Sequence, residues 1–234
     1  MNTNPIYSKD FAYRFYMLSI PVAKFLINDN RESNIFADES RKIEFQLSTS
    51  GPLKLFRSYS SEGYIDSNKN GWNYYLSGSD RGYPEEKLIE YSINGSPVIK
   101  KFIDDKGVNS LTVNQTDRDS IDPFSLLLRT IDQLRSEQQC DNNYSIMDGK
   151  RRYKVKVDLL RISDIRLGVE SAIDYSLYEC EFIMIEQNNK YNRWPFDLKK
   201  KSIKIWFSEE LNYYPIEFNL KTPVGRIKGI LVEG

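Results

Sequence analysis

The stretch Ser120-Ile-Asp-Pro-Phe-Ser-Leu-Leu-Leu-Arg-Thr-Ile-Asp-Gln-Leu-Arg135 is the strongest helix signal in the chain and decides its fold. Asp122 followed by Pro123 places an N-cap oxygen and a first-turn proline where a helix begins. Apolar side chains then recur at helical spacing, at Phe124, Leu127, Leu128, Ile131 and Leu134. Because most of the remaining chain is patterned as strands, only the apolar side of their sheet can cover this face. We therefore expect a helix at about residues 121–136, packed on the concave side of a curved sheet.

Short alternating runs predict strands on both sides of this helix. The clearest covers residues 152–159, where apolar side chains alternate with charged ones. The other predicted strands cover residues 11–18, 22–27, 41–47, 53–65, 72–76, 88–93, 98–103, 175–186, 203–207, 214–220 and 226–232. Polar connections are expected at residues 104–120 and 138–145. The chain therefore predicts a mainly β fold in a single domain spanning residues 1–234: a strongly curved antiparallel sheet or open β-barrel of about ten or more strands with one helix.

The composition argues against several classes of function. The 234 residues carry 33 basic and 33 acidic side chains, so the chain lacks the positive charge expected of a protein that follows nucleic-acid phosphates. It contains no histidine, which excludes Ser-His and Cys-His nucleophile pairs. Two cysteines are too few for a structural zinc site. Apolar runs such as Leu126–Leu128 are much shorter than a transmembrane segment, so we predict none.

We find no motif for catalysis or metal binding. The chain has no nucleophile elbow, phosphate-binding loop, dinucleotide fingerprint or zinc-protease helix. Asp66-Ser-Asn-Lys-Asn-Gly71 begins like a calcium loop, but no acidic residue stands at the closing position, and we interpret it as a turn. A carboxylate pair for glycoside hydrolysis needs only two acidic residues, and the sequence offers no way to choose them. We therefore predict no catalytic residue, metal or cofactor, and the sequence does not support an enzyme.

Aromatic side chains are concentrated between residues 59 and 83. On strands, such residues more often fill cross-strand positions than line a ligand site. If they do line one, the candidates for ligand contact are Tyr59, Trp72 and Tyr74. The two cysteines, Cys140 and Cys180, leave a similar choice, because the residues alone permit either one disulfide or two buried thiols.

Several short motifs follow one another between residues 120 and 232. They are a cysteine before a turn, another cysteine on a following strand, and the sequences Asp122-Pro-Phe-Ser-Leu-Leu-Leu128, Asp148-Gly-Lys-Arg-Arg-Tyr153, Tyr214-Pro-Ile216 and Thr222-Pro-Val-Gly-Arg-Ile227. In this order and spacing, the chain resembles the bacterial envelope family known as domain of unknown function 3108.

The resemblance implies an exported, periplasmic protein with a helix on the concave side of a curved sheet. It supplies no catalytic residue. Its architecture is similar to the open barrels of lipoprotein-carrier proteins, whose concave face holds acyl chains. In an oxidising compartment it also implies a disulfide between Cys140 and Cys180. Because Met1-Asn-Thr-Asn4 lacks the basic and apolar regions of a signal peptide, we expect the export signal to have been removed.

Two functions of different classes follow. The first is binding of a hydrophobic or lipid-like ligand, such as a lipoprotein acyl chain, between the helix and the aromatic strands of residues 53–76. The second is a non-catalytic interaction or structural role in the envelope, in which a sheet edge or the N-terminal half docks another protein and no small ligand is bound. An apolar pocket would favour the first hypothesis, and a filled interior the second.

Overall fold

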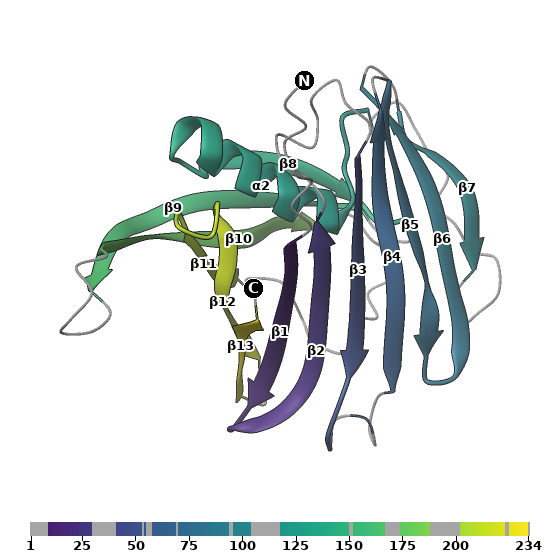
Figure 1. The fold of residues 1–234 in the computed structure, drawn as a ribbon. Coiled ribbons are helices and arrows are strands. Elements are labelled where there is room, and N and C mark those ends of the chain that lie inside the picture. Colours follow the sequence, from purple (N-terminus) through teal and green to yellow (C-terminus); the bar gives the residue numbers. More distant parts are fainter. Residues whose placement is uncertain are drawn as a thin grey trace, which may run out of the picture.

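Thirteen antiparallel strands form one unclosed sheet in the computed structural model of the chain (Figure 1). The structure describes residues 9–29, 41–52, 54, 58–68, 70–93, 96–103, 118–149, 152–166, 174–187, 202–222 and 225–233. The strands are β1 (Lys9–Met17), β2 (Ile20–Asp29), β3 (Arg41–Thr49), β4 (Tyr59–Asn68), β5 (Gly71–Asp80), β6 (Tyr83–Ser92), β7 (Val98–Ile103), β8 (Asn142–Met147), β9 (Arg152–Arg166), β10 (Asp174–Gln187), β11 (Ser202–Ser208), β12 (Tyr214–Thr222) and β13 (Gly225–Glu233).

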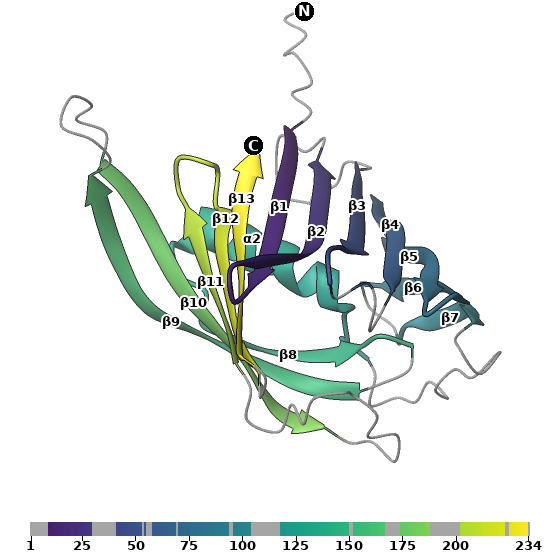
Figure 2. The ribbon, with the colours of Figure 1, turned by 90° about the horizontal axis from the view of Figure 1, so that it is seen from below.

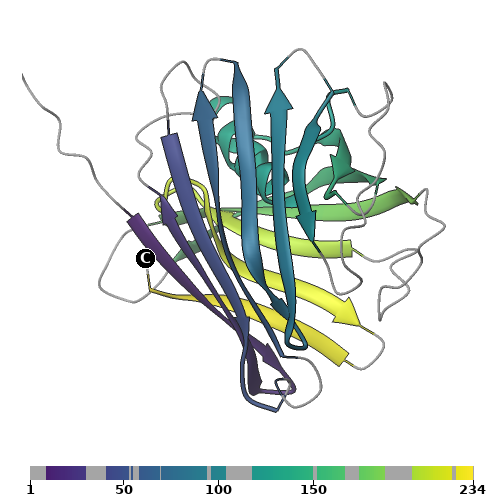
Figure 3. The ribbon, with the colours of Figure 1, turned by 90° about the vertical axis from the view of Figure 1, so that its right-hand side faces the viewer.

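The strand order is β7-β6-β5-β4-β3-β2-β1-β13-β12-β11-β10-β9-β8. The first and last strands of the chain, β1 and β13, therefore pair in the middle of the sheet, and its two edges are β7 and β8. The sheet bends so that the β1–β7 half and the β8–β13 half enclose a concave side (Figure 2). Seen from outside the first half, strands β4 to β6 lie in front of the helix (Figure 3).

The helix α2 (Pro123–Glu137) has a well-defined start and end. The Asp122 side chain accepts hydrogen bonds from the backbone N–H groups of Phe124 and Ser125 at 2.9 and 2.8 Å. At the other end Gln138 adopts the left-handed conformation and its N–H donates to the Leu134 carbonyl at 3.0 Å. These are the usual ways of satisfying the free backbone groups at helix ends, so the sequence motif Asp-Pro does mark the start of the helix.

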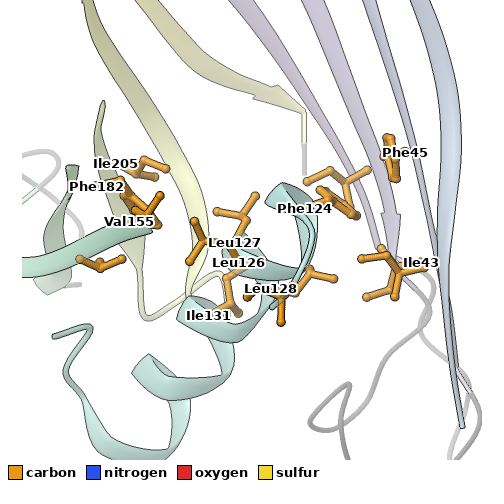
Figure 4. Close-up of a cluster of buried hydrophobic side chains, with 14 of the residues drawn as sticks. Ile43, Phe45, Phe124, Leu126, Leu127, Leu128, Ile131, Val155, Phe182 and Ile205 are labelled. Carbon is orange, nitrogen blue, oxygen red and sulfur yellow. The ribbon is translucent and has the colours of Figure 1, made fainter. Parts of the chain in front are cut away.

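The apolar face of α2 packs against both halves of the sheet. The ring of Phe124 lies 4.3 Å from the ring of Phe45 on β3, measured between centroids. Leu128 and Ile131 are fully buried. Figure 4 shows the helix side chains between Ile43 and Phe45 on one side and Val155, Phe182 and Ile205 on the other. The helix therefore joins the two halves into one core.

A disulfide between Cys140 and Cys180 fixes the segment after the helix to β10. The resemblance implied this pairing, and the structure contains it. Both cysteines are fully buried, and the bond closes a loop with a sequence separation of 40 residues.

The fold class predicted from the sequence is confirmed, but some element boundaries were wrong. Residues 138–145 were expected to be a connection, whereas residues 142–147 form the edge strand β8. Its first residues are polar and exposed, and β9 is the one strand with which it forms a ladder, so it lacks the apolar content of an inner strand. The strand expected at residues 53–65 begins only at Tyr59, after a turn at Gly51. Most of the predicted connection at residues 104–120 lies outside the described residues.

Replacing Leu128 by Ala should lower the free energy of unfolding by about 2–5 kcal/mol, because the change leaves a cavity between the helix and both halves of the sheet. Urea unfolding measures this loss. Ser136→Ala, on the exposed end of the same helix, should change the unfolding free energy by less than about 0.5 kcal/mol. Equal effects of the two changes would contradict the packing described for α2.

The unreduced, denatured protein should contain no free thiol. Replacing both cysteines by serine should destabilise the fold by about 4 kcal/mol on the chain-entropy model, given the length of the closed loop. Thiol titration checks the first expectation and urea unfolding the second. Two reactive thiols in the unreduced protein would contradict the pairing.

Candidate functional site

Asp122 connects the helix start to both halves of the sheet. Besides the two backbone N–H groups, its carboxylate accepts hydrogen bonds from the Ser125 hydroxyl and from the Trp72 indole N–H on β5, the latter at 3.4 Å. The preceding residue, Ile121, exchanges two backbone hydrogen bonds with the edge strand β8. Burial raises the pKa of the Asp122 carboxyl above its ordinary value, and the hydrogen bonds oppose that shift.

The predicted ligand candidates Trp72 and Tyr74 lie in the core at this end of the sheet. They are 5% and 6% exposed. The indole of Trp72 stacks on the ring of Tyr91 with centroids 5.1 Å apart. The Tyr91 hydroxyl donates to the Met147 carbonyl on β8 at 2.7 Å. Trp72 and Tyr74 are therefore core residues, and the β6 side chain of Tyr91 contacts the edge strand β8.

A row of apolar side chains crosses six strands on the concave side, which we call the inner face. The row is defined by direct pairing across the sheet, from β9 through β10, β11, β12 and β13 to β1: Val157, Phe182, Ile203, Leu220, Ile227 and Met17. At the β9 end it belongs to the core, with Val157 fully buried. Further along, Ile203 is 38% exposed, and the last three residues are half-buried. We call this set the inner apolar row.

Aromatic side chains lie beside the inner apolar row. The ring of Phe218 is 5.6 Å from that of Phe15 and 5.3 Å from that of Tyr13, between centroids. Gly229 stands between them, and a Cβ there would lie 2.5 Å from the Phe15 ring. Glycine therefore allows this ring to lie flat against the sheet. Phe15 and Phe218 are half-buried, which leaves part of each ring open.

The third candidate, Tyr59, belongs to a polar group on the same face. Directly paired residues on β2, β3, β4 and β5 connect Tyr13 on β1 with Glu85 on β6. Tyr13 and Glu85 therefore lie on the same face of the sheet. Glu85 forms an ion pair with Lys87 at 2.9 Å, with side chains only 17% and 11% exposed. Burial, followed by the neighbouring Glu85 carboxylate, raises the pKa of Tyr59 to about 12. We call Tyr59, Glu85 and Lys87 the polar cluster.

A hollow lies on the outer, convex face. It has a volume of about 380 Å³ and lies over β1, β2 and β3 near Glu233. Its walls are Asp10, Leu26 and Glu44, which alternate with the buried inner-face residues of the same strands. Leu26 is 43% exposed. This hollow provides a natural control for experiments on the inner face.

The described residues bring together no group of three His, Cys, Asp or Glu that could hold a metal ion. In the same part of the chain, no helix is long and apolar enough to cross a membrane.

A family model for proteins of unknown function, DUF3108, matches residues 11–232, nearly the whole chain. The chain belongs to this family. The match extends the resemblance seen at residues 120–232 to the first half of the chain. A search of curated proteins finds no match.

Two solved structures are similar to the fold. One is the crystal structure of a beta-barrel-like protein of the DUF1849 domain of unknown function from Brucella abortus, with a TM-score of 0.64, 10% identity and coverage of 97% of both chains. The other is the crystal structure of "a putative lipoprotein" from Parabacteroides distasonis, with a TM-score of 0.36, 9% identity and coverage of 96% of this chain and 93% of that chain. The first similarity supports the open, barrel-like architecture and carries no function with it.

Sequence reasoning missed the inner apolar row and Tyr13 as candidate site residues. Residues 11–18 were predicted as a strand. Both faces of that strand carry bulky side chains, so the pattern did not say which of them point inward. Tyr13, Phe15 and Met17 do alternate, but only the pairing of β1 with β13 shows what lies beside them. The signal was therefore present in the alternation and could not be assigned without the sheet order.

Replacing Asp122 by Ala should destabilise the protein by about 1–3 kcal/mol at neutral pH. The change removes the helix cap and the hydrogen bond that the buried carboxylate accepts from the Trp72 N–H. Because the folded pKa of Asp122 is raised, the folded state retains a proton that the unfolded state loses above its ordinary pKa of 3.8. The stability due to Asp122 is therefore largest below that pH and falls as the pH rises through the raised pKa.

Urea unfolding of both proteins between about pH 4 and pH 7 checks this prediction. The difference in unfolding free energy between wild type and Asp122→Ala should shrink with rising pH. A difference that grows over this range would show that the carboxyl pKa is lowered by its hydrogen bonds instead.

Proposed function

We propose that this chain is a non-catalytic binding protein of the bacterial envelope that holds an acyl-chain amphiphile on its inner face. The observation that carries the proposal is the inner apolar row. It begins in the core at Val157 and continues, on the same face, to side chains that are open at Ile203. A monomeric protein usually hides apolar side chains on a concave face, so an open row beside aromatic rings supports a ligand there.

The distribution of polarity supports an amphiphile over a purely apolar ligand. The apolar side chains lie on β10 to β13 and β1, whereas the polar cluster lies on β4 and β6. Five strand spacings separate Tyr13 from Glu85, about 24 Å along the sheet at 4.8 Å each. A molecule with an acyl chain on the apolar side and a polar head near Tyr59 would match both regions.

The expected affinity is moderate. Burial of about twelve methylene groups gains about 10 kcal/mol. Loss of translational and rotational freedom costs at least about 4 kcal/mol. The remaining 6 kcal/mol or so corresponds to a dissociation constant of tens of micromolar.

The periplasm is the compartment that we propose, together with a single domain over residues 1–234. Support comes from the family resemblance and from the buried disulfide, since disulfides persist in oxidising compartments. The competing role, docking of an envelope protein through a sheet edge, is less well supported. The β7 edge carries Lys100 and Lys101, and charged edge residues discourage addition of a further strand.

A dansyl-labelled fatty acid should bind saturably, and Ile203→Asp should raise its dissociation constant at least about tenfold. A carboxylate in the apolar row must be desolvated by the bound chain, which costs more than the 1.4 kcal/mol or so of a tenfold change. Fluorescence titration measures both constants, after circular dichroism has shown that the variants are folded.

Leu26→Asp is the matched control, since Leu26 has a similar exposure on the convex face. It should bind the probe like wild type. If Leu26→Asp weakens binding and Ile203→Asp does not, the ligand belongs in the convex hollow. Absence of saturable binding to wild type would leave the interaction role in place of ligand binding.

A further inference from the structure

The hydroxyl of Tyr13 is a buried polar group without a hydrogen-bond partner among the residues that the structure describes. The residue is 1% exposed. Its ring lies among the aromatic side chains of the inner face, edge-on to Phe218 at 5.3 Å and stacked on Phe25 at 5.9 Å, between centroids. A buried hydroxyl without a hydrogen-bond partner destabilises the folded state by about 1–3 kcal/mol. If the hydroxyl had no function, phenylalanine at this position would give a more stable protein.

The position of Tyr13 is the boundary between the two regions of the inner face. Along β1, its neighbours on the same face include Phe15 and then Met17, the end of the inner apolar row. Across the strands, the pairing from Tyr13 leads through Phe25 and Leu47 toward the polar cluster. An acyl chain on the apolar row with its head at the polar cluster would therefore pass its linking group close to Tyr13.

The Tyr13 hydroxyl, as a neutral hydrogen-bond donor, favours one kind of polar group in the ligand. Burial raises the pKa of Tyr13 above its ordinary value, so the side chain is neutral and can donate one hydrogen bond. The rings of Phe25 and Phe218 lie beside it, and burial alone accounts for its pKa shift, without a contribution from a neighbouring charge. A free carboxylate would have to be desolvated beside Tyr13 without a counter-ion, which is expensive. A neutral carbonyl accepts the same hydrogen bond at a much smaller cost.

We infer that the inner face takes an acyl ester or acyl amide, and that the Tyr13 hydroxyl donates a hydrogen bond to its acyl carbonyl. This inference rests on the proposed function and adds the class of ligand. Lipids with ester-linked chains and N-acylated lipoproteins share this carbonyl, whereas free fatty acids and alkanes lack a neutral one.

Competition against the dansyl-labelled fatty acid tests the inference with three ligands of similar length: methyl dodecanoate, dodecanoate and tetradecane. Wild type should prefer the ester over the alkane by at least about fivefold, the value of one ordinary hydrogen bond. In Tyr13→Phe the ratio of the alkane and ester dissociation constants should fall to about one, because the ring keeps its shape and only the hydroxyl is lost. Dodecanoate at neutral pH should bind more weakly than the ester.

Stability of the ligand-free protein provides a second readout. Tyr13→Phe should raise the urea midpoint, since it removes an unpartnered buried hydroxyl. Tyr178→Phe is the matched control, because Tyr178 is equally buried but shares a hydrogen bond with Tyr213. That change should lower the midpoint and leave the ester preference at its wild-type value.

The outcomes separate the inference from the proposed function. If wild type binds the dansyl probe but the ester preference is the same in Tyr13→Phe, the carbonyl contact is wrong and the binding function stands. If Tyr13→Phe lowers the midpoint as Tyr178→Phe does, the hydroxyl has a partner within the protein and the inference fails. If wild type binds neither the dansyl probe nor methyl dodecanoate, both proposals fall.

Discussion

The buried carboxylate of Asp122 is the interaction on which the arrangement of this sheet depends. It caps α2, accepts the Trp72 N–H from β5 and directly follows Ile121, which is hydrogen-bonded to β8. The β7 and β8 edges share no ladder, so the sheet stays open along its length. Contacts of this kind, together with the Tyr91 hydroxyl on the Met147 carbonyl, hold the two halves around the helix. Such buried polar contacts are costly if broken, and they therefore specify one arrangement.

The inner face has one part that packs on the helix and one part that remains open. The apolar face of α2 and the disulfide at its C-terminal end fill one part of the concavity, where Trp72 and Tyr74 are packed as core residues. The inner apolar row runs from this core to side chains that remain open, and the polar cluster lies on the strands beyond. The open part of the inner apolar row, from Ile203 to Met17, thus lies outside the core cluster that packs on the helix.

The helix and the fold class could be predicted because their signals are local. Asp122 and Pro123 mark a helix start by their own chemistry, and alternation marks most strands. The edge strand β8 escaped because a strand exposed on one side needs few apolar residues. The inner apolar row could not be predicted, since its members come from six strands and meet only through the register of β9 to β13 with β1. The three ligand candidates were chosen because aromatic residues are dense in this part of the sequence. Such density is also typical of core strands, and Trp72 and Tyr74 are core residues, whereas Tyr59 lies in the polar cluster.

The most direct test of this account is photo-crosslinking with a fatty acyl ester that carries a diazirine near the end of its chain, followed by mass-spectrometric mapping of the labelled residues. The account predicts labels on the open part of the inner apolar row, at Ile203, Leu220 and Ile227, and competition by unlabelled ester. Labels confined to the convex face around Leu26, or no labels that unlabelled ester competes away, would contradict it.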